Sequence, residues 1–388
     1  SNLTLKASYS LTADRGPAFV SNSLAMVSSY NPWRPNADVM ESGLGILQGK
    51  NSELTYEKKH ELNLGIDLGF LDNRINMDWY KRKNYDLIGW LSTTGLDGEI
   101  GKYANVASMR SHGIELTLST RNIAKKDFKW NTDFIFSKTK NKVTDLEAFS
   151  SVMDMVSGYG FAMQGYPVRS LFSLDFRGLN EEGLPTFINE NGELTTSNIN
   201  FQERNNKSHL IYEGTTDPTI TGSLGNVFSY KGLKLNVFIT YSFGNVIRLD
   251  PVFSNQYTDL DAMPKEFKNR WMRPGDEHRT NIPVIADKYM NVNDSYLSRA
   301  YNAYNYSSDR IAKGDFIRLK EISLSYDLPK KWIEPLKISN LGLKLQATNL
   351  FLLYADDKLN GQDPEFFNTG GVAVPMAKQF TFTIRLGI

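Results

Sequence analysis

The residues best suited to binding chemistry gather between positions 247 and 312, where aromatic side chains stand among many Asn and Asp residues. Aromatic faces beside hydrogen-bonding groups suit sugar rings or peptides, because the ligand stacks on the ring while amides and carboxylates bond its polar groups. The candidates for such contacts are Tyr257, Trp271, Tyr289, Tyr296 and Tyr304. The alternative for each is that its ring packs this segment against itself or joins an aromatic girdle at a membrane interface.

Groups for covalent or acid–base catalysis do not form a recognisable set. The run Gly222-Ser223-Leu224-Gly225 lacks the spacing of a nucleophile elbow, and the absence of cysteine excludes thiolate chemistry and disulfides. No histidine has the spacing of a metal-binding motif, and the four are far apart: His60, His112, His209 and His278. We therefore expect that the protein is not an enzyme.

Calcium is the one cofactor that the residue types allow. Asp356-Asp357 and Asp363-Glu365 lie close together in the chain with Asn360 between them, and Ca²⁺ prefers such oxygen ligands. The spacing of an EF-hand is missing, and solvated loop charge explains the same residues. We expect no cofactor, with calcium bound in this loop as the alternative.

The elements that must position these loops are long extended segments. In residues 61–70 every second side chain is apolar, from Leu62 to Phe70, while every charge lies on the other face; residues 379–388 repeat the pattern. Ten segments read as strands: 2–11, 57–70, 74–88, 110–122, 128–142, 219–230, 233–246, 313–328, 341–354 and 376–388. Short helices are expected only at 261–271 and 330–336.

Strand length separates two classes of all-β protein. A soluble β-sandwich also alternates, but its strands cluster near about 5–6 residues. Several segments here reach the roughly 9–11 residues that a tilted strand needs to cross a bilayer. A lipid-facing Lys or Arg at mid-bilayer costs about 2–4 kcal/mol, which explains charges confined to one face. The pattern favours a transmembrane antiparallel β-barrel over a sandwich.

The links between strands predict the orientation, since outer-membrane barrels have short periplasmic turns and long extracellular loops. Short links at 71–74, 124–127 and 231–232 alternate with long links at 12–56, 89–109 and 247–312. Residues 168–179 and 184–190 form one further hairpin. Either both of its arms span the membrane, giving about twelve strands, or it projects outside, giving about ten.

Net charge and the length of apolar runs exclude other classes of protein. The formal net charge of the 388 residues is +1, which offers no basic surface for nucleic acid. No apolar run approaches the roughly 18 residues of a spanning helix, and the N-terminal residues lack the pattern of a signal peptide. Neither a repeat nor a linker divides the chain, so we expect one domain over residues 1–388.

Several motifs resemble the SusC/RagA family of TonB-dependent transporters of Bacteroidetes. The longest is KGDFIRLKEISLSYDLP at residues 313–329, preceded by RWMRPGD at 270–276. Further similar stretches are residues 57–73, 78–80 (DWY), 105–107 (NVA), 113–115 (GIE) and 346–351 (QATNLF). The resemblance covers nearly the whole chain in the family's order.

The resemblance implies a 22-stranded barrel in the bacterial outer membrane, of which this chain is about the C-terminal half, the plug domain and the earlier strands being absent from it. It implies TonB-energised import of oligosaccharides or peptides, with TonB acting through the missing N-terminal region. It also implies a SusD-like surface lipoprotein as lid, which the five aromatic candidates would face together with the substrate. The alternative is a soluble or surface-attached β-rich carbohydrate-binding protein.

Overall fold

The computed structural model describes residues 2–16, 25–33, 42–49, 51–92, 101–147, 150–251, 265–285, 297–367 and 377–387. Ten long strands form one antiparallel sheet in the order β1-β4-β5-β6-β7-β13-β14-β17-β18-β19. Their bounds are β1 Asn2–Asp14, β4 Glu57–Phe70, β5 Asn73–Ser92, β6 Gly101–Ala124, β7 Phe128–Leu146, β13 Ile220–Tyr230, β14 Leu233–Phe243, β17 Phe316–Asp327, β18 Asn340–Ala355 and β19 Gln379–Gly387. These are the ten predicted strands in their predicted order, so the all-β antiparallel fold class is confirmed.

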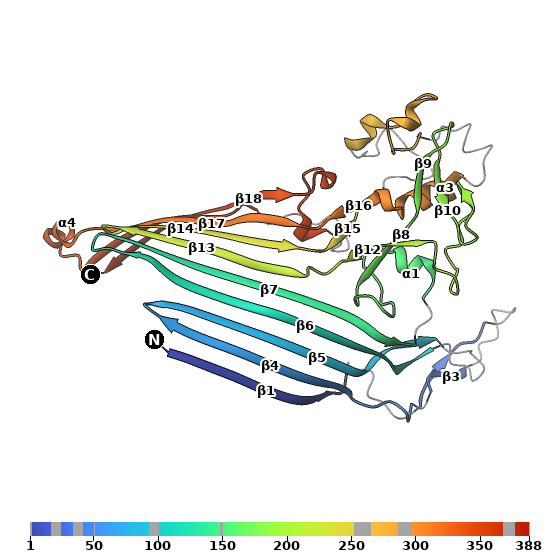
Figure 1. Ribbon diagram of the computed structural model, residues 1–388, viewed down its shortest axis with the longest axis horizontal. Helices are drawn as coiled ribbons and strands as arrows, with labels where there is room; N and C mark the ends of the chain where they lie inside the picture. The colour runs from blue at the N-terminus through green and yellow to red at the C-terminus, as the bar shows by residue number, and fades with distance from the viewer. Residues whose placement is uncertain are drawn as a thin grey trace.

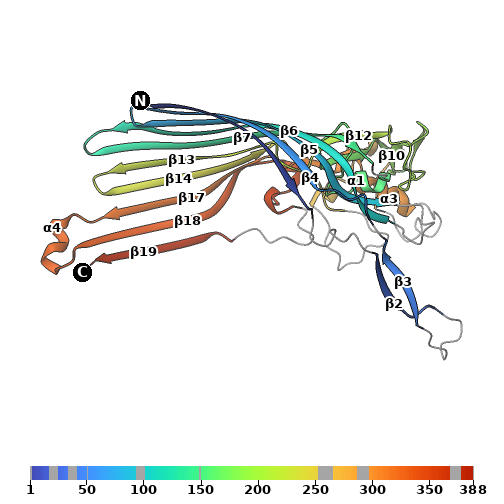
Figure 2. The same ribbon diagram turned by 90° about the horizontal axis from the view of Figure 1, so that it is seen from below.

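The sheet is strongly curved and its two ends differ (Figures 1 and 2). Both chain termini and the short links lie at one end, where Leu71-Asp72 and Lys231-Gly232 close hairpins with positive φ at both central residues. Such turns match the right-handed twist of the strands they join. At the other end lie the long links with their own secondary structure. The predicted alternation of short and long links is confirmed for the short links and for the long links between β1 and β4 and between β14 and β17, while the link between β5 and β6 is much shorter than predicted.

The strand register gives the sheet one apolar and one polar face. Leu5, Ile66, Met77, Leu116 and Phe136 lie directly opposite one another across five strands, and all are apolar. The row beside it, on the opposite face, consists of Lys6, Gly65, Asp78, Glu115 and Ser137. The apolar face is open, since Leu5 is 71% and Phe382 58% exposed. Among the described residues no second sheet packs against it, in contrast to a sandwich.

The long links fold over the other end of the sheet. Their strands are β2 Met26–Tyr30, β3 Gly43–Gln48, β8 Ser170–Leu174, β9 Phe176–Leu179, β10 Pro185–Ile188, β11 Leu194–Thr195, β12 Leu210–Thr215, β15 Val246–Arg248 and β16 Ile311–Lys313. The helices there include α1 Val152–Val156 and α3 Leu297–Asn305. Strands β9 and β10 pair with β11 in a sheet of their own, so the hairpin does not join the large sheet and the count of ten strands is correct.

A hydrophobic core lies in this cap of links, not in the sheet. Phe187, Leu297, Tyr301 and Tyr304 are almost completely buried there, and Phe176 packs edge-on against Tyr304. Apolar side chains from two separate links, residues 147–219 and 244–315, meet in this core, which gives the loops a fixed arrangement. No helix among the described residues is both long and apolar enough to span a membrane.

Some boundaries differ from the sequence prediction. The predicted loop 89–109 is wrong over most of its length, because β5 continues to Ser92 and β6 begins at Gly101, with an edge-to-face contact between Trp90 and Tyr103. Helix α3 was not predicted. The helix at 330–336 is confirmed as α4 Lys330–Ile333 and η5 Glu334–Leu336, and the one near 261–271 is the short η2 Lys265–Asn269.

Candidate functional site

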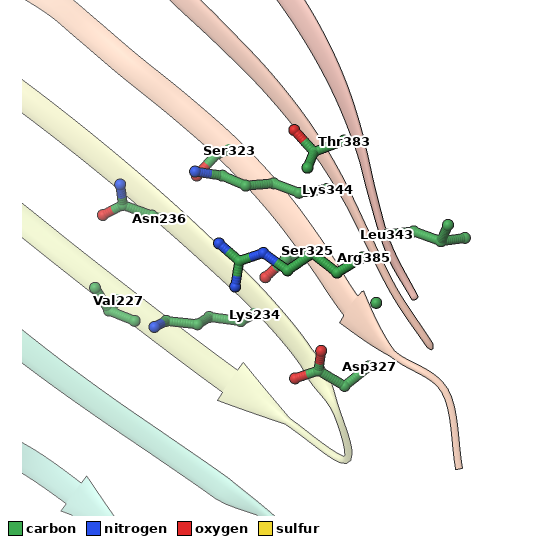
Figure 3. Close-up of a pocket in the computed structure, with 11 residues that line it drawn as sticks. Val227, Lys234, Asn236, Ser323, Ser325, Asp327, Leu343, Lys344, Thr383 and Arg385 are labelled. Carbon is green, nitrogen blue, oxygen red and sulfur yellow. The ribbon is translucent and has the colours of Figure 1, made fainter. Parts of the chain in front are cut away.

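The polar face carries a hollow near the short-turn end, with a volume of about 430 Å³ (Figure 3). Lys234, Lys344 and Arg385 line it with Asp327 and several Ser, Thr and Asn side chains. The four charged groups come from β14, β18, β19 and β17, and the register places Arg385 opposite Gly342, next to Asp327. Three cations and one carboxylate suit an anionic or hydroxyl-rich segment running along this wall.

A second cavity of about 570 Å³ lies where the sheet meets the cap of links. Thr221 and Thr240 line it from the sheet, while Arg169, Asn245 and Glu365 line it from the links. Arg169 also forms an ion pair of 3.0 Å with Asp217. Hydroxyl, amide, guanidinium and carboxylate groups in one cavity can bond the hydroxyls of a sugar or the amides of a peptide.

Arg248 fixes the links to one another. Its guanidinium donates to the carbonyl oxygens of Phe172 at 2.7 Å and Ser307 at 3.0 Å and to the Ser173 hydroxyl at 2.8 Å. Burial lowers the pKa of Arg248 to about 10, so it stays charged at neutral pH. Burial also raises the pKa of the nearby Glu213 carboxyl. The buried cation therefore joins segments more than 70 residues apart.

Two further buried arginines also connect distant segments of the chain. Arg310 pairs with Glu266 and donates to the Asp250 carbonyl at 3.0 Å. Arg318, on β17, pairs with Asp363 and, at 3.2 Å, with Glu365. Each arginine is almost fully buried and has several partners, which offsets the desolvation of its charge.

The carboxylates proposed as calcium ligands have protein donors in this structure. Asp363 accepts from Arg318, and Asp356 accepts from the backbone N–H groups of Lys313 and Lys358. Within the described part of the chain, no group of His, Asp and Glu residues has the arrangement of a metal site.

The structure describes two of the five aromatic candidates, and these two have different surroundings. Trp271 is half-buried, lies against Gly183 and donates from Nε1 to Glu277 at 2.9 Å, so it holds the β9–β10 turn in place. Tyr304 is 0% exposed, and its hydroxyl donates to Asp309 at 2.9 Å. The prediction that Tyr304 faces a ligand or lid is therefore wrong, because its ring packs the links against each other. Tyr257, Tyr289 and Tyr296 lie outside the described residues.

Sequence reasoning missed the buried arginines as a group. The available signal was a single charge inside an apolar run, as in VIRL at 246–249 and FIRL at 316–319. Such a charge is buried only where partners from elsewhere in the chain meet it, and those partners cannot be located from the local pattern.

No family model matches the chain. Among curated proteins it is 26% identical over 345 residues to TonB-dependent receptor P3 of Formosa agariphila, covering 84% of this chain and 32% of that protein. It is 23% identical to TonB-dependent receptor SusC of Bacteroides thetaiotaomicron, covering 87% of this chain and 32% of SusC. The chain spans about a third of the length of these curated relatives.

Among solved structures the fold matches the RagAB peptide transporter with a TM-score of 0.76 at 23% identity, over 100% of this chain and 40% of that one. This chain is therefore SusC/RagA-like. The relatives are named as receptors and transporters and none is named as an enzyme.

A SusC/RagA-like sheet belongs to an outer-membrane β-barrel. This assigns the two faces of the sheet to lipid and lumen and its two ends to the two sides of the membrane. The apolar face is the lipid side and the polar face is the lumen wall. The end with the short turns is periplasmic, and the cap of links is extracellular. The hollow in Figure 3 is then a lumen feature near the periplasm, and the second cavity lies at the extracellular mouth.

Proposed function

We propose that this chain supplies lumen wall and extracellular mouth to an outer-membrane importer of oligosaccharides or peptides, energised by TonB. The observation that carries the proposal is the sheet with an exposed apolar stretch on its outer face, a polar inner face and a folded cap at one end. The barrel separates lipid from lumen, and the cap forms a binding surface over the lumen. No bond in the substrate is made or broken.

A surface lipoprotein of the SusD type is the proposed lid. The RagAB structures similar to this chain are described as a peptide importer in "open-open" and "closed-closed" states, which supports a mouth that is covered and uncovered. The exposed parts of the cap would be the contact surface. Stable co-purification of one lipoprotein with the membrane-extracted protein tests this part.

Import is tested with a strain that lacks the gene and is complemented with wild type or with K234E/K344E/R385E. Uptake of labelled oligosaccharide and peptide pools is measured. We expect the deletion to abolish uptake of one pool and the triple variant to lower it, because the lumen wall would then repel an anionic segment.

The matched control is K125E/K126E/K330E, which reverses three exposed lysines at the periplasmic turns. It changes net charge equally and should leave uptake near wild type. Heat-modifiable migration on gels confirms that each variant is folded. Equal uptake by the deletion and wild-type strains, or solubility of the protein without detergent, would contradict the proposal.

A further inference from the structure

A band of positive charge lies on the outward face of β4 to β7, directly above the apolar stretch. One row beyond Phe136 toward the extracellular end, Lys138 lies opposite Ile114. In the next row Lys81, His112 and Lys140 are mutually opposite, and in the row after it His60, Lys83, Arg110 and Lys142 are. These eight residues form the basic band: His60, Lys81, Lys83, Arg110, His112, Lys138, Lys140 and Lys142.

The lysines and the arginine of the basic band lack acidic partners within the described protein, while His60 forms a hydrogen bond of 2.6 Å with the Tyr9 hydroxyl. Its five lysines and Arg110 are all exposed, and none of them forms an ion pair with a described residue. Other cations nearby do have partners. Lys58 pairs with Asp86 at 2.8 Å, and on the inner face Arg82 pairs with Glu61 at 3.0 Å.

Like charges directly opposite each other on neighbouring strands repel and destabilise a sheet. Lys83, Arg110 and Lys142 are three such cations in one row, and Lys81 and Lys140 lie in the row below them. This arrangement calls for anions from outside the chain. In the row of Lys138 the next residues on β13 and β14 are the apolar Ile220 and Phe243. The band is thus confined to one sector of the wall.

The position of the band indicates the anion. It begins where the lipid-facing apolar rows end, on the extracellular side, which is the level of the headgroups in the outer leaflet. Lipid A headgroups there carry phosphates on a glucosamine disaccharide, and ammonium and guanidinium groups bind phosphate through charge-assisted hydrogen bonds. We infer that the basic band is a docking surface for the phosphorylated headgroup of lipid A. This inference depends on the outer-membrane location and not on the imported substrate.

The test measures lipid A binding by native mass spectrometry on protein extracted from outer membranes. Lipid A is added either with both phosphates or after enzymatic dephosphorylation. Wild type should prefer the phosphorylated form. The variant K81Q/K83Q/K138Q/K140Q should bind it at least about tenfold more weakly, since each cation near an anionic lipid surface contributes several-fold. Both proteins should bind the dephosphorylated form equally.

The matched control K125Q/K126Q/K330Q/K331Q removes four exposed lysines at the periplasmic end and should bind like wild type. Equal binding of phosphorylated lipid A by wild type and the band variant would overturn the inference. The inference would also be overturned if wild type bound the phosphorylated and dephosphorylated forms equally. Co-purification of an acidic protein with wild type but not with the band variant, without any preference for phosphate, would overturn it as well. Loss of import with lipid A binding unchanged would affect only the proposed function.

Discussion

Arg318 on β17 and Asp363 in the link between β18 and β19 form a buried ion pair across 45 residues of sequence. Their side chains are only 7% and 8% exposed. The pair joins the lumen wall to the last extracellular link, beside the cavity at the mouth. A wall residue thereby adds to the contacts that hold this link, in which Lys358 donates to the Ile311 carbonyl and Leu359 is buried.

We expect Asp363→Asn to destabilise the protein by about 3–5 kcal/mol, because it leaves the Arg318 charge buried without its main counter-charge. Thermal unfolding in detergent measures the loss. Asp175→Asn is the control, since its partner Arg177 is 56% exposed and such pairs contribute about 0–1 kcal/mol. An equal loss of stability in Asp363→Asn and Asp175→Asn would show that the burial of Arg318 does not increase the contribution of its ion pair.

Gly222 on β13 lies beneath Tyr241 of β14, whose hydroxyl crosses the strand and donates to the Ile135 carbonyl on β7 at 2.9 Å. A Cβ at Gly222 would clash with that carbonyl oxygen and with the tyrosine hydroxyl. Gly222→Ala should therefore cost about 1–3 kcal/mol through overpacking. Gly225→Ala in the same strand is the control, since its nearest contact is an ordinary 3.4 Å to Phe238. Heat-modifiable migration over a temperature series compares them.

Leu345 and Gln346 are neighbours on β18 that face lipid and lumen respectively. Leu345→Arg should cost about 2–4 kcal/mol and lower the amount of assembled barrel, because it places a cation in the hydrocarbon layer. Gln346→Arg, beside Ser323 and Thr381, should assemble near wild-type levels. Quantification of folded protein in outer-membrane fractions is the measurement. An equal effect of both substitutions is incompatible with opposite surroundings for the two faces.

His209 in the extracellular cap predicts a pH effect on stability. Its side chain is 9% exposed, neither ring nitrogen has a partner among the described residues, and burial lowers its pKa below the ordinary 6.5. The unfolded chain therefore binds the proton more readily, so stability is fully present above about pH 6.5 and falls as the pH drops through the lowered value. Wild type should lose thermal stability between pH 7 and pH 5 more steeply than His209→Asn. His278→Asn, at an 84% exposed side chain, should follow wild type.

The sequence by itself determined the ten strands, their two faces and the alternation of link lengths. These features are local, because the side chains of a strand alternate with period two and each turn depends on a few adjacent residues. The sided pattern of residues 61–70 and 379–388 needed no knowledge of the partner strand. The same locality explains why the helix at 330–336 was found.

Only the tertiary structure decided what depends on residues far apart in the chain. It placed β9 and β10 outside the large sheet, buried Tyr304 in the core of the cap and paired Arg318 with Asp363. The alternating lysines at 138, 140 and 142 are visible in the sequence, but the register alone puts Lys140 opposite His112 and Lys142 opposite Arg110. Contacts between distant segments depend on how the strands pair and how the links pack, which no local period encodes.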